Sequence, residues 1–146
     1  MDVRPYTPAD DAEWRRMRRA LWPHHAPDLE VSDAAAWRAR TDAAVIVAVR
    51  PDGAGLGGFA EVGARDYADG CATSPVAYLE GWYVDPDVRR TGVGAALVRT
   101  AEAWARGRGD REFASDALLE NVTSQRAHTA LGFAEVERSV KYRKAL

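Results

Sequence analysis

The sequence predicts an α/β fold in which a central β-sheet is flanked by helices. Apolar segments of strand length alternate with segments of helical period along the 146 residues. Pro75–Val84 is an apolar segment that runs into a turn rich in arginine and glycine, and this turn opens an amphipathic helix. The turn signal Pro51–Gly55 separates two further apolar segments, as expected for a β-hairpin.

Length and composition narrow the class of protein. We expect one domain over residues 1–146, because the chain can bury a core but is too short for two domains. Hydrophobic residues at 47% and charged residues at 29% are typical of a soluble globular protein, and no apolar run is long enough to span a membrane. The first residues lack the basic and apolar regions of a secretory signal and Cys71 is the single cysteine, so we expect no such signal and a cytoplasmic location. The net charge of −2 does not indicate a nucleic-acid-binding face.

Strands are expected where apolar residues dominate short segments between turn signals. The expected strands are Asp2–Pro5, Ala43–Val49, Leu56–Val62, Val76–Val84, Glu112–Asp116 and Val136–Lys144. Gly63–Ser74 has no clear period and is expected to be a loop, and loops of this length are often functional.

The expected helices begin and end at recognisable signals. Thr7 is a plausible N-cap followed by Pro8, and Pro23 ends that helix at Trp22, leaving a loop with exposed aromatic and imidazole groups. Further helices are expected at Ser32–Arg40, Gly92–Arg106 and Ser124–Leu131. Two apolar stripes are predicted to face the core: Trp14, Met17 and Leu21 in the first helix, and Val93, Leu97, Ala101 and Trp104 in the third.

The segment Val84–Gly94 carries the most specific signal in the chain. It reads V-D-P-x-x-R-x-x-G-x-G and directly follows a strand. Such a turn presents several main-chain N–H groups and a helix N-terminus to one point, which suits a pyrophosphate. Its glycines allow close approach to the main chain, and Arg89 and Arg90 can add charge-assisted hydrogen bonds.

This segment resembles the acyl-CoA pyrophosphate loop of the GCN5-related N-acetyltransferases, and the resemblance covers nearly the whole chain. Several shorter segments resemble, more narrowly, the bacterial aminoglycoside 6′-N-acetyltransferases. These segments are Arg18–His25, Asp66–Cys71, Ser74–Val76, Leu79–Gly81, Ala114–Asp116 and Tyr142–Lys144. The resemblance implies a single-domain acetyltransferase fold with a mixed central sheet, splayed between its fourth and fifth strands at the acyl-CoA site.

The resemblance also implies acetyl-CoA as cosubstrate, and we expect no metal. The implied acyl-CoA contacts are Trp82, Tyr83, Val84, Arg89, Arg90, Thr91, Gly92, Val93, Gly94 and Asn121. Trp82 to Val84 are expected to pair with the pantetheine arm through their main chain, while their side chains pack in the core. Asn121 has the alternative role of forming a turn.

Glu80 and Asp116 are the candidate catalytic carboxylates. Glu80 lies in the middle of an apolar strand, where an ionised side chain is costly without a partner, although strand alternation alone also allows it to point into solvent. Asp116 ends a strand, where aspartate often caps a turn. The resemblance favours a substrate-contacting carboxylate, hydrogen-bonded directly or acting through water, for Glu80 and an amine-binding role for Asp116.

The implied substrate contacts are Trp22, Tyr67, Glu80, Asp116 and Glu137. Trp22 and Tyr67 offer flat faces to sugar rings, or pack as satellite core. Glu137 alternatively lies on the solvent side of an alternating strand. A polycationic acceptor also needs several converging carboxylates, because one exposed pair contributes only about 0.2–1 kcal/mol.

The proton donor for the departing thiolate is left open by the sequence. His128 stands where many relatives have a tyrosine, and it is either the acid or a structural residue of its helix. Tyr142 is an alternative donor. The reaction also allows the thiolate to leave without a dedicated acid. His24 and His25 make a weak metal site, and Cys71 lacks a nearby base.

Three functions are compatible with these observations. The first is acetyl transfer from acetyl-CoA to the 6′-amine of aminoglycosides, by direct attack of the neutral amine on the thioester. The second is acetylation of a polyamine, another small amine or a protein amine, and the third is a non-catalytic acyl-CoA-binding module. By resemblance, we expect a homodimer with Val136–Lys144 as an interface.

Overall fold

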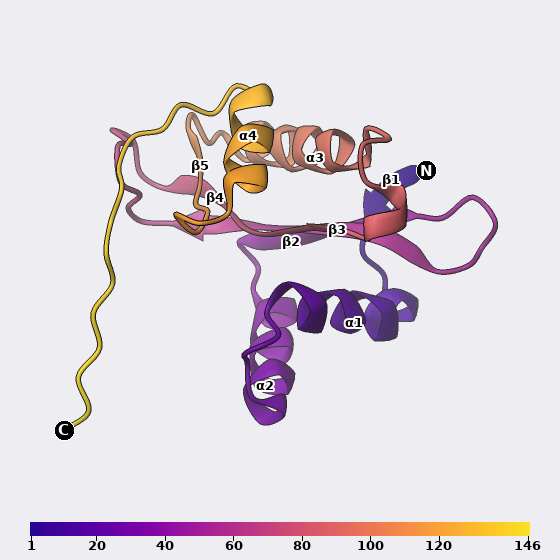
Figure 1. Cartoon of the computed structure of the whole chain (residues 1–146). Coiled ribbons are helices and arrows are strands. Elements are labelled where there is room, and N and C mark those ends of the chain that lie inside the picture. The colour runs from indigo at the N-terminus through magenta and orange to yellow at the C-terminus, as the bar shows by residue number, and fades with distance from the viewer.

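The computed structural model describes residues 1–146 and places helices on both faces of one β-sheet (Figure 1). The strands follow the order β1-β2-β3-β4-β5 across the sheet. Their bounds are Asp2–Pro5, Ala43–Val49, Leu56–Arg65, Val76–Val84 and Phe113–Ser115. The first four strands are antiparallel to their neighbours and β5 is parallel to β4, which confirms the mixed central sheet.

Two helices cover each face of the sheet. The helices α1 (Asp11–Leu21) and α2 (Pro27–Ala39) lie on one face, and α3 (Val93–Arg108) and α4 (Val122–Ala130) lie on the other (Figure 1). Short 3-10 helices, η1 at Pro8–Asp10 and η2 at Pro86–Val88, precede α1 and the turn before α3. No helix is both long and apolar enough to cross a membrane.

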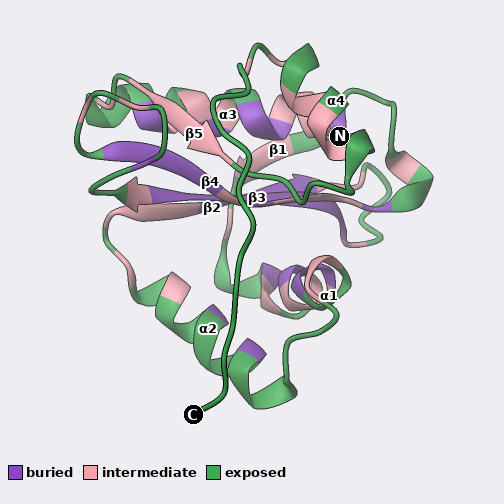
Figure 2. Cartoon of the chain, turned by 60° about the vertical axis from the view of Figure 1, so that its left-hand side comes forward, coloured by how far each residue is buried: buried purple, intermediate pink, exposed green.

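The predicted apolar stripes form the core. Val93, Leu97 and Ala101 of α3 are buried against the sheet, with Trp104 half-buried beside them. Trp14 and Met17 of α1 are fully buried on the opposite face with Phe59 of β3, and Leu21 packs at the edge of this cluster. Figure 2 shows that burial is concentrated in the sheet and the helix faces turned toward it.

The edge between β4 and β5 is open along half its length. β5 pairs with β4 only from Ala77↔Phe113 to Leu79↔Ser115, and β4 then continues to Val84 with no partner on that side. On its other side β4 carries a β-bulge, because Gly81 pairs with Glu61 and Leu79 with Val62, which leaves Glu80 unpaired. Bulges often re-aim side chains next to active sites, so Glu80 is directed by the backbone as well as by sequence alternation.

Some predicted boundaries are wrong. The helix expected at Ser32 begins five residues earlier, with Pro27 at its first turn, and β3 extends to Arg65. The strand expected at Val136–Lys144 is absent: residues 134–146 have no regular secondary structure and no main-chain hydrogen bond. This segment runs away from the sheet as an extended chain, without a neighbouring strand to pair with (Figures 1 and 2).

Candidate active site

The turn between β4 and α3 exposes a continuous set of unused hydrogen-bond donors. The main-chain N–H groups of residues 89–95 make no hydrogen bond within the protein, and the first donor in the helix, Ala96, bonds to the Gly92 carbonyl. Gly92 has φ +90° and Arg90 has φ +64°, so the chain passes through left-handed conformations at both residues. Free N–H groups at a helix N-terminus bind anions, so this turn fits the diphosphate of an acyl-CoA.

Side chains within the turn hold its shape. Arg89 Nε donates to the Val84 carbonyl at 2.9 Å, and Thr91 Oγ1 donates to the Val88 carbonyl at 2.6 Å. Their side chains are exposed, as is that of Arg90. Arg89 is therefore held near the end of β4, while Arg90 is free to meet a ligand.

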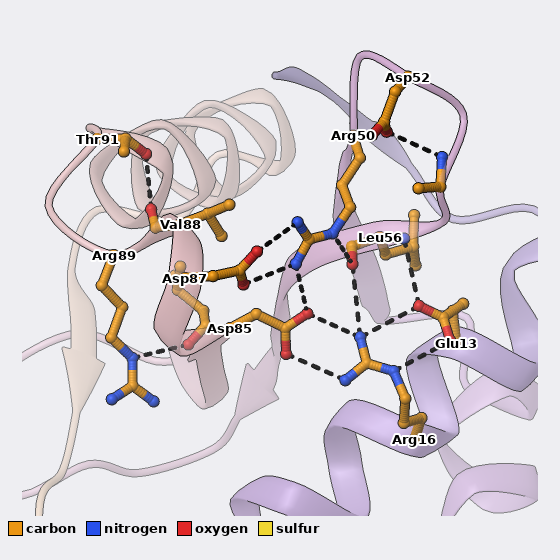
Figure 3. Close-up of polar contacts among 12 residues, drawn as sticks. Glu13, Arg16, Arg50, Asp52, Leu56, Asp85, Asp87, Val88, Arg89 and Thr91 are labelled. Atoms are coloured by element: carbon orange, nitrogen blue, oxygen red, sulfur yellow. Dashed lines mark hydrogen bonds and ion pairs between the residues drawn. The ribbon is translucent and has the colours of Figure 1, made fainter.

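A buried carboxylate anchors the start of the turn (Figure 3). Asp85, which directly follows β4, accepts hydrogen bonds from Arg16 of α1 at 2.8 and 3.0 Å and from Arg50 of the β2–β3 hairpin at 3.1 Å. Arg50 also binds Asp87 through two nitrogens at 2.8 and 2.9 Å. Burial alone would raise the pKa of Asp85, but the two arginines outweigh it and keep that pKa below its usual value. The turn is thus fastened to α1 and to the hairpin.

The predicted catalytic carboxylates lie together at the open end of β4, each with a partner. Glu80 receives two hydrogen bonds from Arg65 of β3, at 2.6 and 2.7 Å. Asp116 accepts a hydrogen bond from the Tyr78 hydroxyl, and the Arg65 guanidinium lies 3.5 Å from the centre of the Tyr78 ring. Burial, and then the bond to Asp116, raise the pKa of Tyr78, so it stays protonated as a donor.

The Trp22 ring packs beside the cluster of Glu80, Arg65, Tyr78 and Asp116. A Cβ at Gly81 would lie 2.9 Å from the Trp22 ring, so the ring packs directly on β4 next to Glu80. Trp22 also meets Phe59 edge-on and stacks on His25. Trp22, expected to be exposed in its loop or packed as satellite core, is half-buried because its ring packs on β4.

A buried ion pair supports the inner face of Trp22. The Arg18 guanidinium lies 4.8 Å from the Trp22 ring centre and pairs with Glu61 of β3 and Asp33 of α2. Trp14 Nε1 donates to Glu61 at 3.0 Å. Burial raises the pKa of Glu61 to about 7 against the opposing effect of Arg18.

Tyr67 and Glu137 lie at the loop between β3 and β4. The Tyr67 hydroxyl donates to Asp69 at 2.9 Å, and this bond raises the Tyr67 pKa. A Cβ at Gly70 would meet Val136, so the C-terminal segment crosses this loop and brings Glu137 near Tyr67. Ala68 of the same loop packs with Tyr78, which connects the loop to the carboxylate cluster.

The remaining predicted contacts have structural partners. Trp82, Tyr83 and Val84 are half-buried, and Trp82 Nε1 donates to the Gly94 carbonyl at 3.2 Å. Asn121 caps α4 by accepting the Ser124 N–H at 3.1 Å. Tyr142 is exposed on the C-terminal segment, and no group of three metal-binding side chains is present.

Sequence reasoning missed Arg65 and Tyr78. Both act on the carboxylates across strands: the Arg65–Glu80 contact depends on the β3–β4 register and on the bulge at Glu80, and the Tyr78–Asp116 contact depends on the β4–β5 register. One signal in the sequence could have pointed to Tyr78: it lies two residues before Glu80, and residues two apart in a regular strand share a face.

The chain belongs to the acetyltransferase (GNAT) family, whose family model matches residues 11–133. Within that class its relatives are aminoglycoside N(6′)-acetyltransferases of type 1. The protein of this name from Klebsiella aerogenes is 49% identical, over 99% of this chain and 96% of its own length. The one from Stenotrophomonas maltophilia is 45% identical, over 99% and 93% respectively.

Solved structures give the same result. The structure of AAC(6′)-Iy in complex with the bisubstrate analogue CoA-S-monomethyl-acetylneamine has a TM-score of 0.90 and 37% identity, covering 99% of this chain and 98% of that chain. The apo enzyme AAC(6′)-IG from Acinetobacter haemolyticus has a TM-score of 0.90 and 35% identity, over 100% and 99%. The acetyl-CoA-dependent class of enzyme and the fold follow from these likenesses.

Proposed function

We propose that this protein transfers an acetyl group from acetyl-CoA to the 6′-amino group of aminoglycosides. One observation carries the proposal: the open half of β4 joins the free N–H groups of residues 89–95 to the cluster of Glu80 and Asp116. An acyl donor held at the turn and lying along β4 would present its thioester to an amine held by the two carboxylates. The full-length relatives named above support the same acceptor class.

The chemistry asks for little beyond positioning and a neutral amine. Holding two reactants side by side supplies about 7–11 kcal/mol in favourable cases. An amine whose pKa lies about two to three units above the working pH costs roughly 3–4 kcal/mol to deprotonate. Glu80 accepts that proton directly or through water, while Asp116 holds the amine. The nitrogen then attacks the thioester carbon, and the carbon–sulfur bond breaks.

Acceptor identity is tested by following thiol release from acetyl-CoA with a panel of amines. We expect turnover with kanamycin and tobramycin, none with their 6′-hydroxyl analogues, and an acetyl group located on the 6′-nitrogen by mass spectrometry. Turnover with spermidine or peptides alone would show that the acceptor is not an aminoglycoside. The absence of thiol release with every amine would show that the protein does not catalyse acetyl transfer.

The carboxylates are tested separately from the donor site. Glu80→Gln should lower kcat/KM for the aminoglycoside by about 10²-fold, the scale of general acid–base catalysis, and Asp116→Asn should lower it by a similar factor through loss of a positioning contact. Acetyl-CoA affinity, measured by calorimetry, should change less than about twofold because the diphosphate is held elsewhere. Equal losses for both ligands would contradict these roles.

We further propose a cytoplasmic homodimer. Acetyl-CoA is a cytoplasmic metabolite, which supports the location. Residues 134–146 expose Val136, Val140 and Tyr142 on an extended segment with no main-chain partner, as a strand donated to a second copy would. Light scattering should give a dimer mass, and Val140→Lys should give a monomer, whereas Val31→Lys on the exposed face of α2 should not. A monomer at every concentration would exclude the dimer.

A further inference from the structure

Ser115, His128 and a helix carbonyl form a chain of hydrogen bonds that the functions assigned above do not use. Ser115 Oγ lies 2.8 Å from His128 Nε2, and His128 Nδ1 lies 2.7 Å from the Ser124 carbonyl oxygen. A carbonyl only accepts, so Nδ1 carries a proton. Nε2 is therefore the nitrogen that exchanges a proton with the serine hydroxyl.

The imidazole is held in a fixed orientation. The rings of Trp82 and His128 are perpendicular at a ring-centre distance of 5.2 Å, and the Phe133 ring also lies 5.2 Å from the imidazole. The ring is half-buried between α4 and the sheet. This arrangement fixes which nitrogen faces Ser115, as a histidine that transfers protons requires.

Ser115 lies where β4 and β5 separate. Leu79↔Ser115 is the last pair between these strands, and Glu80 is the next residue of β4. The pantetheine arm between the diphosphate and the sulfur has as many bonds as about four residues of main chain, or about 13 Å when extended. Four residues of strand from Val84 reach Glu80, also about 13 Å. With the diphosphate placed level with Val84, where the turn begins, an arm lying along β4 would bring the sulfur beside Ser115.

We propose that Ser115 and His128 form a proton relay to the departing coenzyme A sulfur, which rests on the acetyl transfer proposed above. As the carbon–sulfur bond breaks, its electron pair goes to sulfur. The Ser115 hydroxyl gives its proton to sulfur and receives the Nε2 proton of His128, which was protonated on both nitrogens. His128 becomes neutral and regains a proton from solvent before the next cycle. The products are the acetamide and the free thiol.

The relay is tested with two acyl donors that differ only in the leaving atom. Acetyl-CoA and acetyl-seleno-CoA bind through the same groups, but a selenolate is much less basic than a thiolate and leaves without a proton. Ser115→Ala and His128→Gln remove the transferred proton. His128→Gln keeps an amide that can still donate to Ser115. Thr129→Ala is the matched control, since this exposed hydroxyl of α4 bonds only to its own helix.

Under single-turnover conditions with tobramycin, both variants should slow acetyl-CoA turnover about 100-fold and selenoester turnover less than about 10-fold. In separate steady-state assays KM for both substrates should change less than about twofold, and Thr129→Ala should match the wild type. Equal slowing with both donors would show that Ser115 and His128 have a structural role and would overturn the relay. Unchanged turnover in the two variants would also overturn it. An acetyl group on Ser115, found by mass spectrometry, would make it a nucleophile and also overturn the relay. Failure of the wild type to acetylate any amine would instead refute the proposed function.

Discussion

At the scale of single residues, Arg65 controls the charge that an acceptor meets. Its guanidinium neutralises Glu80 and covers the Tyr78 ring, so an incoming ammonium group must compete with it for the carboxylate. The pair is partly exposed, with 22% of the Glu80 side chain accessible, and such pairs exchange partners at a cost of about 1 kcal/mol or less.

Replacing Arg65 should therefore strengthen acceptor binding. Arg65→Gln removes a cation that repels the ammonium groups, and we expect aminoglycoside affinity to rise by up to about fivefold at low salt. Calorimetric titration measures the change, with Arg99→Gln on the exposed face of α3 as a control of equal charge change. A weaker affinity in Arg65→Gln alone would mean that Arg65 binds the substrate or orients Glu80.

At the scale of elements, the turn before α3 depends on the helix and hairpin that anchor it. Arg50→Gln removes two charged contacts to Asp87 and one to Asp85 (Figure 3). We expect KM for acetyl-CoA to rise about 3- to 10-fold, because ordering the turn then costs part of the binding free energy. KM for the aminoglycoside should stay within about twofold in steady-state kinetics. A change confined to the acceptor would show that the anchor serves the other substrate.

The connection between β1 and α1 gives the fold an acid-sensitive contact. Hydrogen bonds from Arg4, opposed by burial and helped by Thr7, lower the pKa of Asp10 to about 2. Because this pKa is lower in the folded state than in the unfolded state, the stabilisation is complete above about pH 4 and disappears as the pH falls toward 2. After allowance for the exposure of Arg4, it amounts to about 1–2 kcal/mol.

Asp10→Asn tests this contact while keeping a side-chain oxygen for the Thr7 N–H. The free energy of unfolding, from urea titrations, should fall by about 1–2 kcal/mol at pH 6 and by much less near pH 2. Asp52→Asn in the exposed hairpin turn serves as the control. If the loss in free energy of unfolding is the same at both pH values, it comes from the capping hydrogen bond and not from the charge of Asp10.

Local sequence signals predicted most helices and strands. The predictions that failed depend on pairing between residues far apart in the sequence. β4 begins and ends where its apolar run predicts, and α3 starts one residue from its expected position. The strand at Val136–Lys144 has the composition of a strand but no partner in this chain, and pairing is not encoded locally. At the site, the motif predicted the turn, and the resemblance pointed to the two carboxylates, whose roles stay predictions. The arginine that holds Glu80 comes from a register that a single sequence does not reveal.

At the scale of the whole molecule, the net charge of −2 is too small to attract a polycation over long distances. Attraction must come from the carboxylates gathered at the open end of β4 and the neighbouring loop. We expect the aminoglycoside Kd to rise about tenfold between 0.02 and 0.5 M salt, as screening shortens from about 20 Å to a few ångströms. The dependence, measured by calorimetry, should weaken in a Glu80→Gln/Asp116→Asn double variant. An unchanged slope would place the relevant charges elsewhere.

The two halves of the site also differ in what a point mutation can alter. The donor turn offers main-chain groups, which most side-chain replacements leave in place, with Gly92 as an exception because of its positive φ. The acceptor side, as proposed above, is built from Trp22, which directly follows α1, and from side chains of the β3–β4 loop and β4. Under drug selection, such an enzyme is free to diversify the antibiotics it recognises one residue at a time, while its use of a common metabolic acyl donor is inherited intact.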